Sequence, residues 1–394
     1  MRGASGRHIY LGNYIISQLR KFRIHDTMKT NNDIRCSSRI SKEMAVIHHI
    51  PRVSISAKGR MTMFKTAIGQ SENPSAKDAV QEILTQIRES IGDTIPQAGI
   101  LLCAIDFDHS QIIASIRNAY PGMELAGCTT DGEMSSVNGF CGDSVLLMVF
   151  VTDVIEIRAG VGRDLRLHSR EAGMEAALNA HLHMKRQRGK ERFAIIFADP
   201  VYIGTSDVDI GIATQFGQAF PLIGAATAAH SKQRATYQFC NSEILTDSAV
   251  ILLFSGPVCF SFGAQGGYAP MGGKAKITSS AKHVLYRIEN EPAFDFFQRT
   301  VGDGFNLFTN YCWAVFEEGR KGFYVRRAAS VDPSIGSVTL NGTIADEAWI
   351  QIGIADKAAC IDSCTASLRT ALASYPGTQP TAALLFSCSR RKTV

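Results

Sequence analysis

Leu125-Ala-Gly-Cys-Thr-Thr130 and Leu222-Ile-Gly-Ala-Ala-Thr227 are two versions of one pattern, with their glycines 97 positions apart. Farther along the chain, Asp143 matches Asp247 at a spacing of 104, and both begin an apolar run. The difference in spacing falls in the polar segment between the two matches, where insertions are tolerated. Several matches in the same order predict an internal duplication.

Each copy predicts the same succession of elements. A buried strand comes first, a helix follows it, and the glycine-containing segment comes next. Two apolar runs then predict strands that pair as a hairpin. In the first copy these are the strand Ala98–Cys103, the helix with Ile112, Ile113 and Ile116, and the strands 143–150 and 154–159; in the second they are 194–199, 210–216, 247–254 and 258–263. The predicted fold class is therefore α/β. It consists of duplicated strand–helix–strand–hairpin units with mixed sheets, parallel where the helix crosses over and antiparallel in the hairpin.

The first 60 residues differ in charge from the rest of the chain. They carry twelve Lys and Arg against three acidic residues, whereas the remainder has a net charge of −4. A slightly negative body gives no electrostatic footprint for nucleic acid. We interpret residues 1–60 as a disordered tail or as the product of a misassigned start, with Met61 or Met63 as the natural one. A strand is predicted directly after Met63 and a helix from Ser75.

The composition predicts a cytoplasmic protein. No apolar run reaches the eighteen or so residues that span a bilayer, so membrane insertion is not expected. Ten cysteines in a chain of 394 residues do not form the disulfide framework of a small secreted domain. We expect most of them to be reduced thiols in apolar surroundings.

A further α/β domain begins late in the chain. Residues 357–374 predict a helix, and Ala382–Cys388 is similar to the buried strand Ala98–Cys103. The chain then ends within a few residues, which would leave the strand without a partner. We therefore expect this second domain to be incomplete, truncated near residue 390.

Five dispersed segments resemble the FIST family (F-box and intracellular signal transduction). The first resembles the family's Gly-Cys-Thr-Thr-x-Gly-Glu pattern, and the last is similar to Leu-Phe-Ser-Cys-x-Gly-Arg, although it lacks that glycine. In order they are Gly127–Glu133, Asp143-Ser144, Phe262–Gly272, Tyr286–Ala293 and Leu385–Arg390. The resemblance implies a FIST N-terminal domain over residues 61–290 and a FIST C-terminal domain over residues 291–394.

The resemblance implies a sensory role. FIST modules occur in bacterial signalling proteins, alone or beside histidine kinases and cyclic-dinucleotide enzymes, and are proposed to bind amino-acid-like metabolites. No Gly-x-Ser-x-Gly or Ser-His-Asp arrangement stands out, so we expect no enzymatic activity. A module that binds partners without any ligand is a further alternative.

The two glycine segments are the candidate ligand site. Backbone N–H groups and threonine hydroxyls can converge after a strand end, which suits a small ligand. Tight turns that need glycine for their backbone angles are the equal alternative. The candidate residues are Gly127, Cys128, Thr129, Thr130, Gly224 and Thr227.

No resident cofactor or metal is expected, with one alternative. Some stand-alone members of the family are haem-based nitric oxide sensors that regulate a kinase. Haem needs an axial ligand, and His230 and His283 are the candidates. Asp106, Asp108 and His109 follow a strand and could act as acid and base, but Asp108 is better placed to cap the next helix.

Overall fold

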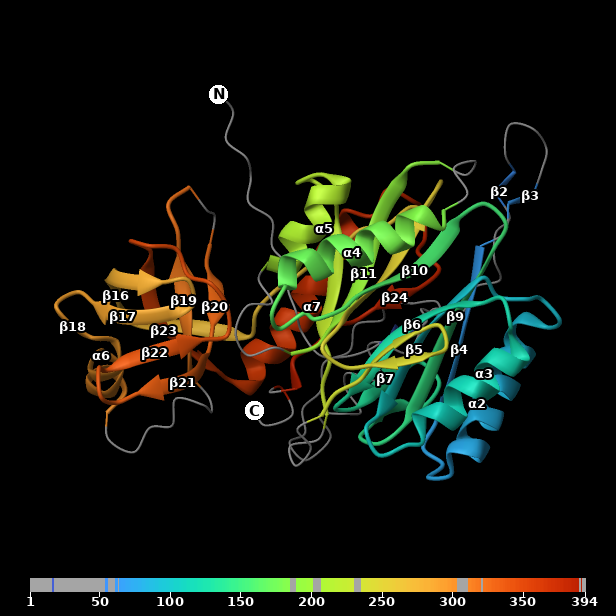
Figure 1. Ribbon diagram of the computed structural model, residues 1–394, viewed down its shortest axis with the longest axis horizontal. Coiled ribbons are helices and arrows are strands. Elements are labelled where there is room, and N and C mark those ends of the chain that lie inside the picture. Colours follow the sequence, from blue (N-terminus) through green and yellow to red (C-terminus); the bar gives the residue numbers. More distant parts are fainter. Residues whose placement is uncertain are drawn as a thin grey trace, which may run out of the picture.

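Two mixed β-sheets packed face to face form the larger part of the molecule, and a third, antiparallel sheet lies at the other end of the long axis (Figure 1). The computed structural model describes residues 64–184, 189–200, 207–229, 235–302, 311–319, 322–389 and 391. Before these, it places only the backbone of three short strands, β1 (Ile16–Ser17), β2 (Ser54–Ile55) and β3 (Met61–Thr62). The predicted disordered tail otherwise lies outside the described residues.

The first sheet and its helices form one unit of the duplication. The strand predicted after Met63 and the helix predicted from Ser75 are both present, and the Ser75 hydroxyl caps the helix by accepting from the N–H of Asp78. The sheet order is β6-β5-β9-β4, with β5 parallel to β6 and the other pairs antiparallel. The elements are β4 (Phe64–Ser71), α2 (Ala76–Ile91), β5 (Ala98–Ala104), α3 (His109–Ala119), β6 (Glu124–Thr130), β7 (Glu133–Ser135), β8 (Gly139–Cys141) and β9 (Val145–Thr152).

The second sheet repeats this order as β12-β11-β15-β10, which confirms the duplication. Its elements are β10 (Glu156–Gly162), α4 (Ser169–Leu182), β11 (Glu191–Ala198), α5 (Val208–Phe216), β12 (Leu222–Ala226), β13 (Gln238–Cys240), β14 (Glu243–Leu245) and β15 (Ala249–Ser255). Each unit therefore begins one strand and one helix earlier than the sequence pattern indicated, at β4 and at β10. The hairpin β13–β14 crosses over and extends the first sheet beside β6.

The predicted hairpins at the end of each unit are wrong, although the α/β class and the mixed sheets are confirmed. β9 and β10 lie in different sheets, because β9 already has β4 on one edge and β5 on the other. Similarly, β15 lies between β10 and β11. Residues 258–263 therefore form no strand, and the chain runs instead along a later helix, where the Ser261 hydroxyl donates to the carbonyl of Ala371 at 2.7 Å.

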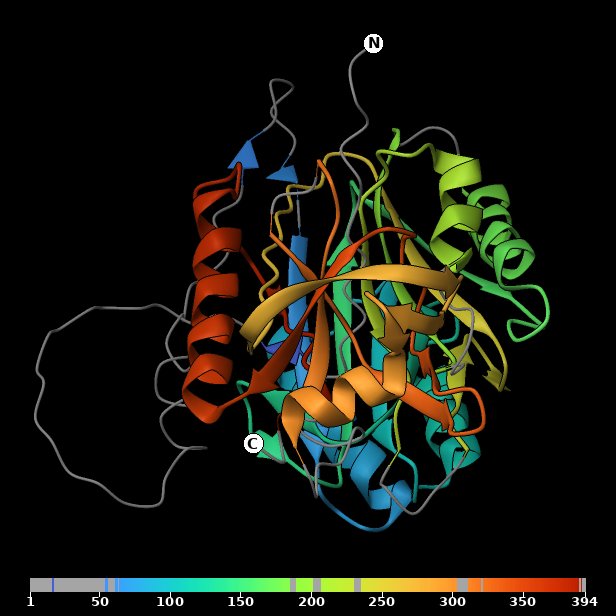
Figure 2. The same cartoon turned by 90° about the vertical axis from the view of Figure 1, so that its left-hand side faces the viewer.

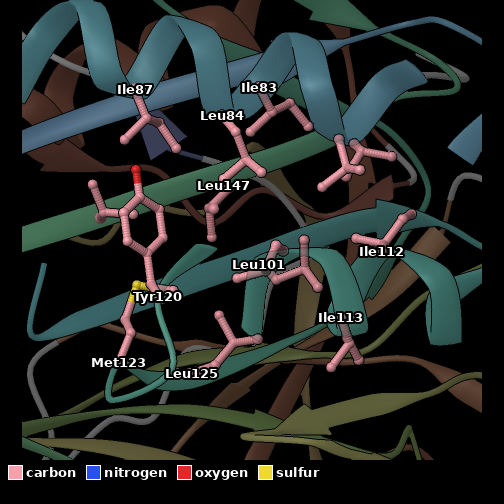
Figure 3. Packing of buried hydrophobic residues seen from close by; sticks show 14 of the residues in the cluster. Ile83, Leu84, Ile87, Leu101, Ile112, Ile113, Tyr120, Met123, Leu125 and Leu147 are labelled. Atoms are coloured by element: carbon pink, nitrogen blue, oxygen red, sulfur yellow. The ribbon is translucent and has the colours of Figure 1, made fainter. Parts of the chain in front are cut away.

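The two sheets and their helices make four layers. α2 and α3 cover the outer face of the first sheet (Figure 3), and α4 and α5 cover that of the second. The inner faces pack on each other through residues such as Met148 and Leu252. Because both faces of each sheet are buried, the central strands are continuous apolar runs rather than alternating ones. Among the described residues, no helix has the length and the hydropathy to cross a membrane.

The third sheet is formed by the rest of the chain. Its order is β20-β19-β23-β16-β17-β22-β21, with β18 beside β17, and its core contains Phe297 and Trp313. The elements are β16 (Tyr268–Ala281), β17 (Val284–Ile288), β18 (Glu291–Pro292), α6 (Ala293–Val301), β19 (Tyr311–Phe316), β20 (Tyr324–Arg326), β21 (Ala328–Asp332), β22 (Ser337–Leu340), β23 (Trp349–Ala355), α7 (Lys357–Ala373) and β24 (Ala383–Leu384). The sheet thus includes β16 and β17, which lie before residue 290.

The end of the chain returns to the two-sheet part of the molecule. The helix predicted at 357–374 is α7, but the strand predicted at 382–388 is only the two-residue β24, paired with β1. Ala382, Leu384 and Phe386 pack against the core between the two sheets. This segment is half-buried at the margin of that core and is not a central strand like β5.

Gly127 and Gly224 lie inside β6 and β12, so the tight-turn alternative is wrong. A Cβ atom at either position would overlap with the carbonyl oxygen of the neighbouring parallel strand, that of Leu101 or of Ile196. Glycine is therefore needed for the close approach of two backbones rather than for a left-handed conformation.

We expect Gly224→Ala to lower the free energy of unfolding by about 3 kcal/mol, because the added methyl group forces β11 and β12 apart. Gly142→Ala is the matched control, since a Cβ there meets nothing within 4 Å, and a change within about 0.5 kcal/mol is expected. Chemical denaturation of both variants measures the difference. Equal effects would show that the close approach of the strands is not what requires glycine.

Candidate functional site

The carboxyl ends of the two parallel strand pairs meet at one place. Just after β12, the N–H of Ala228 donates to the carbonyl of Thr129 in β6 at 3.0 Å. Tyr237, just before β13, accepts from the N–H of Thr129 at 2.9 Å and donates its own N–H to the Thr129 hydroxyl at 3.0 Å. The two glycine segments, far apart in the sequence, therefore lie side by side. Carboxyl ends of parallel strands are where α/β proteins commonly bind ligands.

In the first unit, the polar groups at this edge satisfy one another. The fully buried Glu133 carboxylate accepts from the N–H and the hydroxyl of Ser144, at 3.2 and 2.6 Å, and from the hydroxyl of Thr130. Gln70 donates to the Ser144 hydroxyl at 3.1 Å and accepts from that of Ser135. This first cluster joins β4, β6 and β7 to Ser144, just before β9, and its members hydrogen-bond to one another.

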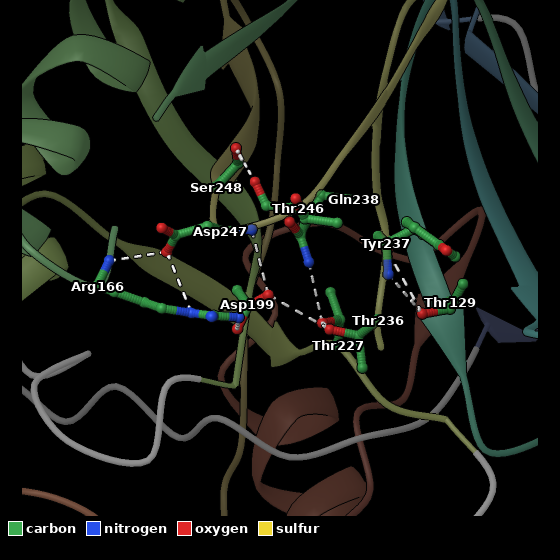
Figure 4. A network of polar contacts seen from close by, with 10 residues as sticks. All are labelled: Thr129, Arg166, Asp199, Thr227, Thr236, Tyr237, Gln238, Thr246, Asp247 and Ser248. Carbon is green, nitrogen blue, oxygen red and sulfur yellow. Dashed lines mark hydrogen bonds and ion pairs between the residues drawn. The ribbon is translucent and has the colours of Figure 1, made fainter. Parts of the chain in front are cut away.

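In the second unit, a second cluster consists of Asp199, Thr227, Thr236 and Gln238 (Figure 4). The Gln238 amide donates to the Thr227 hydroxyl at 3.1 Å, that hydroxyl donates to Thr236 at 2.8 Å, and Thr236 lies 3.5 Å from Asp199 Oδ2. Gln238 is fully buried, yet its Oε1 has no hydrogen-bond partner among the residues that the structure describes. An unpaired buried amide oxygen costs about 1–3 kcal/mol, so the second cluster keeps an unused acceptor.

Charged groups of both signs border the second cluster. The Arg166 guanidinium lies 3.8 Å from Asp199 Oδ1 and 3.6 Å from Asp247 Oδ1, and its side chain is 60% exposed. Burial raises the pKa of the Asp199 carboxyl, and the charge of Asp247 adds to the rise. The N–H of Asp247, Arg166 and the Thr236 hydroxyl act in the opposite direction.

The duplication shows that the fold does not require a carboxylate at position 199. The N–H of Asp199 donates to the carbonyl of Ser248 at 3.0 Å, and Ala104 makes the same bond to Ser144 in the first unit, also at 3.0 Å. The equivalent residue is thus an alanine. A buried ionisable group that the fold can replace by a methyl group is a candidate for function.

Two family models match the chain in succession. The FIST N domain matches residues 97–291 and the FIST C domain matches residues 293–394. The chain belongs to the FIST family. A comparison with curated proteins found no match. FIST domains are sensory domains of signal transduction, so this protein has a sensory role, and signalling domains of this type imply interaction with partners.

Within the FIST N domain, the six predicted ligand residues have different surroundings. Gly127 and Gly224 allow the strands to approach, and Cys128 lies in the core between the sheets, where burial raises the pKa of its thiol. Thr129 holds the chain before β13, and Thr130 belongs to the first cluster. Thr227 alone reaches the second cluster.

The sequence prediction missed Arg166, Thr236 and Gln238, and it did not single out Asp199. Asp199 had a signal, since it ends the second copy of a buried strand whose first copy has alanine at that position. The other three come from loops and a short strand outside the repeated pattern.

Of the two predicted haem ligands, only His283 is among the described residues, and it is not part of this FIST N edge. His230 lies outside the described residues. His283 is in the turn between β16 and β17 of the third sheet, where its carbonyl accepts from the N–H of Leu340 at 2.7 Å. The predicted cap is confirmed, because the Asp108 carboxylate accepts from the N–H of Gln111 at 3.0 Å. His109 contacts the Ala104 carbonyl, and burial lowers its pKa.

We expect Asp199→Asn to stabilise the protein at neutral pH. Folding raises the pKa of the Asp199 carboxyl, so its contribution to stability is fully present below the unfolded pKa of about 4. That contribution is lost as the pH rises through the folded pKa, because the charged carboxylate is then buried. The variant should therefore unfold at a higher temperature than the wild type at pH 7, with the difference disappearing towards pH 4.

Thermal unfolding between pH 4 and pH 8 measures this difference. Asp108→Asn is the control, because asparagine caps a helix as well as aspartate and the site is exposed. A lower melting temperature of Asp199→Asn at pH 7 would instead show that the attraction to Arg166 exceeds the cost of burial.

Proposed function

We propose that this FIST protein is a cytoplasmic sensor that binds an amino-acid-like metabolite at the second cluster and signals through a partner. It acts by binding rather than by catalysis, and the partner is a histidine kinase or a cyclic-dinucleotide enzyme. The observation that carries the proposal is the buried carboxylate of Asp199 at a position where the duplicated unit has alanine.

The arrangement of charges supports a zwitterionic ligand. An α-amino acid presents an ammonium group and a carboxylate a few ångströms apart. Asp199 can accept from the ammonium group, and the half-exposed Arg166 guanidinium can bind the carboxylate in place of its long contacts to Asp199 and Asp247. These contacts are weak enough for a ligand to replace them.

The neutral groups support the same class of ligand. The unpaired Oε1 of Gln238 is an acceptor for a second N–H of the ammonium group, and Thr227 fixes the amide through its hydroxyl. A site built to hydrogen-bond such a group discriminates strongly against analogues that lack it. We therefore expect amines and amino acids to bind, and simple carboxylic acids to bind far more weakly.

The position of the second cluster also suits signalling. It joins Gln238 of β13 to residues of the loops after β10, β11 and β12, and β13 is hydrogen-bonded to β6 of the other sheet. A ligand bound there would contact groups from both sheets. It therefore favours one relative arrangement of the two sheets, which a partner can detect as a shift in population.

A panel of amino acids tested by thermal shift examines the proposal. A ligand at a hundred times its dissociation constant adds about 2.7 kcal/mol of stability, which gives a rise in melting temperature of several degrees. Asp199→Asn should abolish the rise although the variant itself is expected to be more stable, so loss of binding cannot be attributed to unfolding.

Asp108→Asn should respond to the ligand as the wild type does. A folded wild-type protein that responds to no member of the panel would contradict the proposal. An absorption spectrum of the protein expressed with haem supply completes the test, since a Soret band that shifts with nitric oxide would favour a haem sensor instead.

A further inference from the structure

Helix α4 exposes its large apolar side chains and buries its small ones, which is the reverse of the usual pattern in a surface helix. The residues that it buries against the second sheet and α5 are all small, namely Ala172, Gly173, Ala176, Ala177 and Ala180. The residues that it exposes include Met174, Leu178 and Leu182, whose exposed fractions are 40, 43 and 67%. They follow one another at intervals of four and form a continuous stripe, the α4 stripe. Both α4 and α5 lie on the outside of the molecule (Figure 2).

The duplication provides an internal comparison with α2. Gly69 of β4 would clash with Ile83 of α2, and Gly160 of β10 would clash in the same way with Ala176 of α4, so positions 83 and 176 are equivalent. On α2 four of the five equivalent inner positions are large, Ala79 being the exception, and the outer ones are polar. Counted from this pair, Met174, Leu178 and Leu182 occupy the positions of Gln81, Thr85 and Glu89.

Packing within the unit explains the small inner residues but not the stripe. Gly173 lies against the backbone of Val208, and Gly211 of α5 lies against that of Arg170. These close approaches require small residues between α4, α5 and the sheet. Nothing in them requires leucine on the outer face, where the equivalent helix has polar residues. Leu167, just before α4, and Ile210 of α5 are also exposed, by 81 and 40%. A contiguous apolar surface of this kind marks an interface.

We propose that the α4 stripe is the interface of a homodimer in which two copies of α4 pack antiparallel about a two-fold axis at Leu178. The stripe is self-complementary about this residue, because Met174 and Leu182 lie four positions to either side of it. A two-fold rotation therefore places apolar side chains on apolar side chains.

The distribution of charge along α4 favours the antiparallel arrangement with a second copy. Both carboxylates, Glu171 and Glu175, lie in the N-terminal half together with Arg170, and the helix has no carboxylate from Leu178 to its end at Leu182. Antiparallel packing sets the acidic half of one helix against the half of the other that has no carboxylate. It also places each positive helix N-terminus beside a negative C-terminus. Parallel packing would set the carboxylates of the two copies against each other.

The oligomeric state of the full chain tests the proposal. Light scattering coupled to gel filtration should give the mass of a dimer for the wild type. Leu178→Glu places a charge on the axis and should raise the dissociation constant by roughly a hundredfold. Thr85→Glu, at the equivalent outer position of α2, should leave the dimer unchanged. A monomeric wild type at about 100 µM, or a Leu178→Glu variant that is still a dimer, would overturn the proposal.

A crosslink tests the arrangement of the two copies. In Leu178→Cys, the two introduced thiols face each other across the axis, and diamide should oxidise them to one disulfide, taking up the two electrons and two protons. A band of twice the mass is expected on a non-reducing gel. The wild type, which contains the native cysteines, and Thr85→Cys should give no such band. Met174→Cys would face its own copy only in a parallel dimer, so it should give no such band. A band from Met174→Cys, or none from Leu178→Cys, would overturn the antiparallel arrangement.

Discussion

The inner faces of the two sheets bury each other, and the rest of the structure depends on this contact. A sheet with helices on one side only would leave the other face, with residues such as Met148 and Leu252, exposed to water. Each unit therefore supplies the cover for the other. This explains why the duplication is retained, why the strands are apolar on both faces, and why the chain passes from one sheet to the other after β9 rather than turning back in a hairpin.

Comparison of the two units distinguishes residues that the fold requires in both from residues that are present in only one. Both units keep a glycine where β5 approaches β6 and where β11 approaches β12. Both place a buried polar residue after the parallel pair, Glu133 in one and Gln238 in the other. The partners differ, however. Glu133 is satisfied by Ser144 and Thr130, whereas the amide of Gln238 keeps one unpaired atom among the described residues and is linked to the buried carboxylate of Asp199 through the hydroxyls of Thr227 and Thr236.

The differences lie on opposite sides of the second unit. The second cluster is at the edge where the two sheets meet, and the α4 stripe is on the outer helical layer of the second sheet. A ligand bound at the meeting edge, as proposed, would act on the unit that carries the proposed dimer contact, whose helix α4 packs on β10 and β15. Such a layout allows ligand binding and association to influence each other by linkage.

The sequence by itself determined the elements and their succession. Local elements depend on burial patterns and hydrogen bonds among residues that are neighbours in the sequence. Examples are the strand at 98–103, the caps at Ser75 and Asp108, and the helix from Lys357. The repeat of Gly127 at Gly224 was visible for the same reason. Only the tertiary structure decided which strands pair, because pairing depends on which strand edges are already occupied. The tertiary structure also determined which residues form the second cluster. Arg166, Asp199 and Gln238 come from separate loops and strands that meet only when the two sheets have stacked.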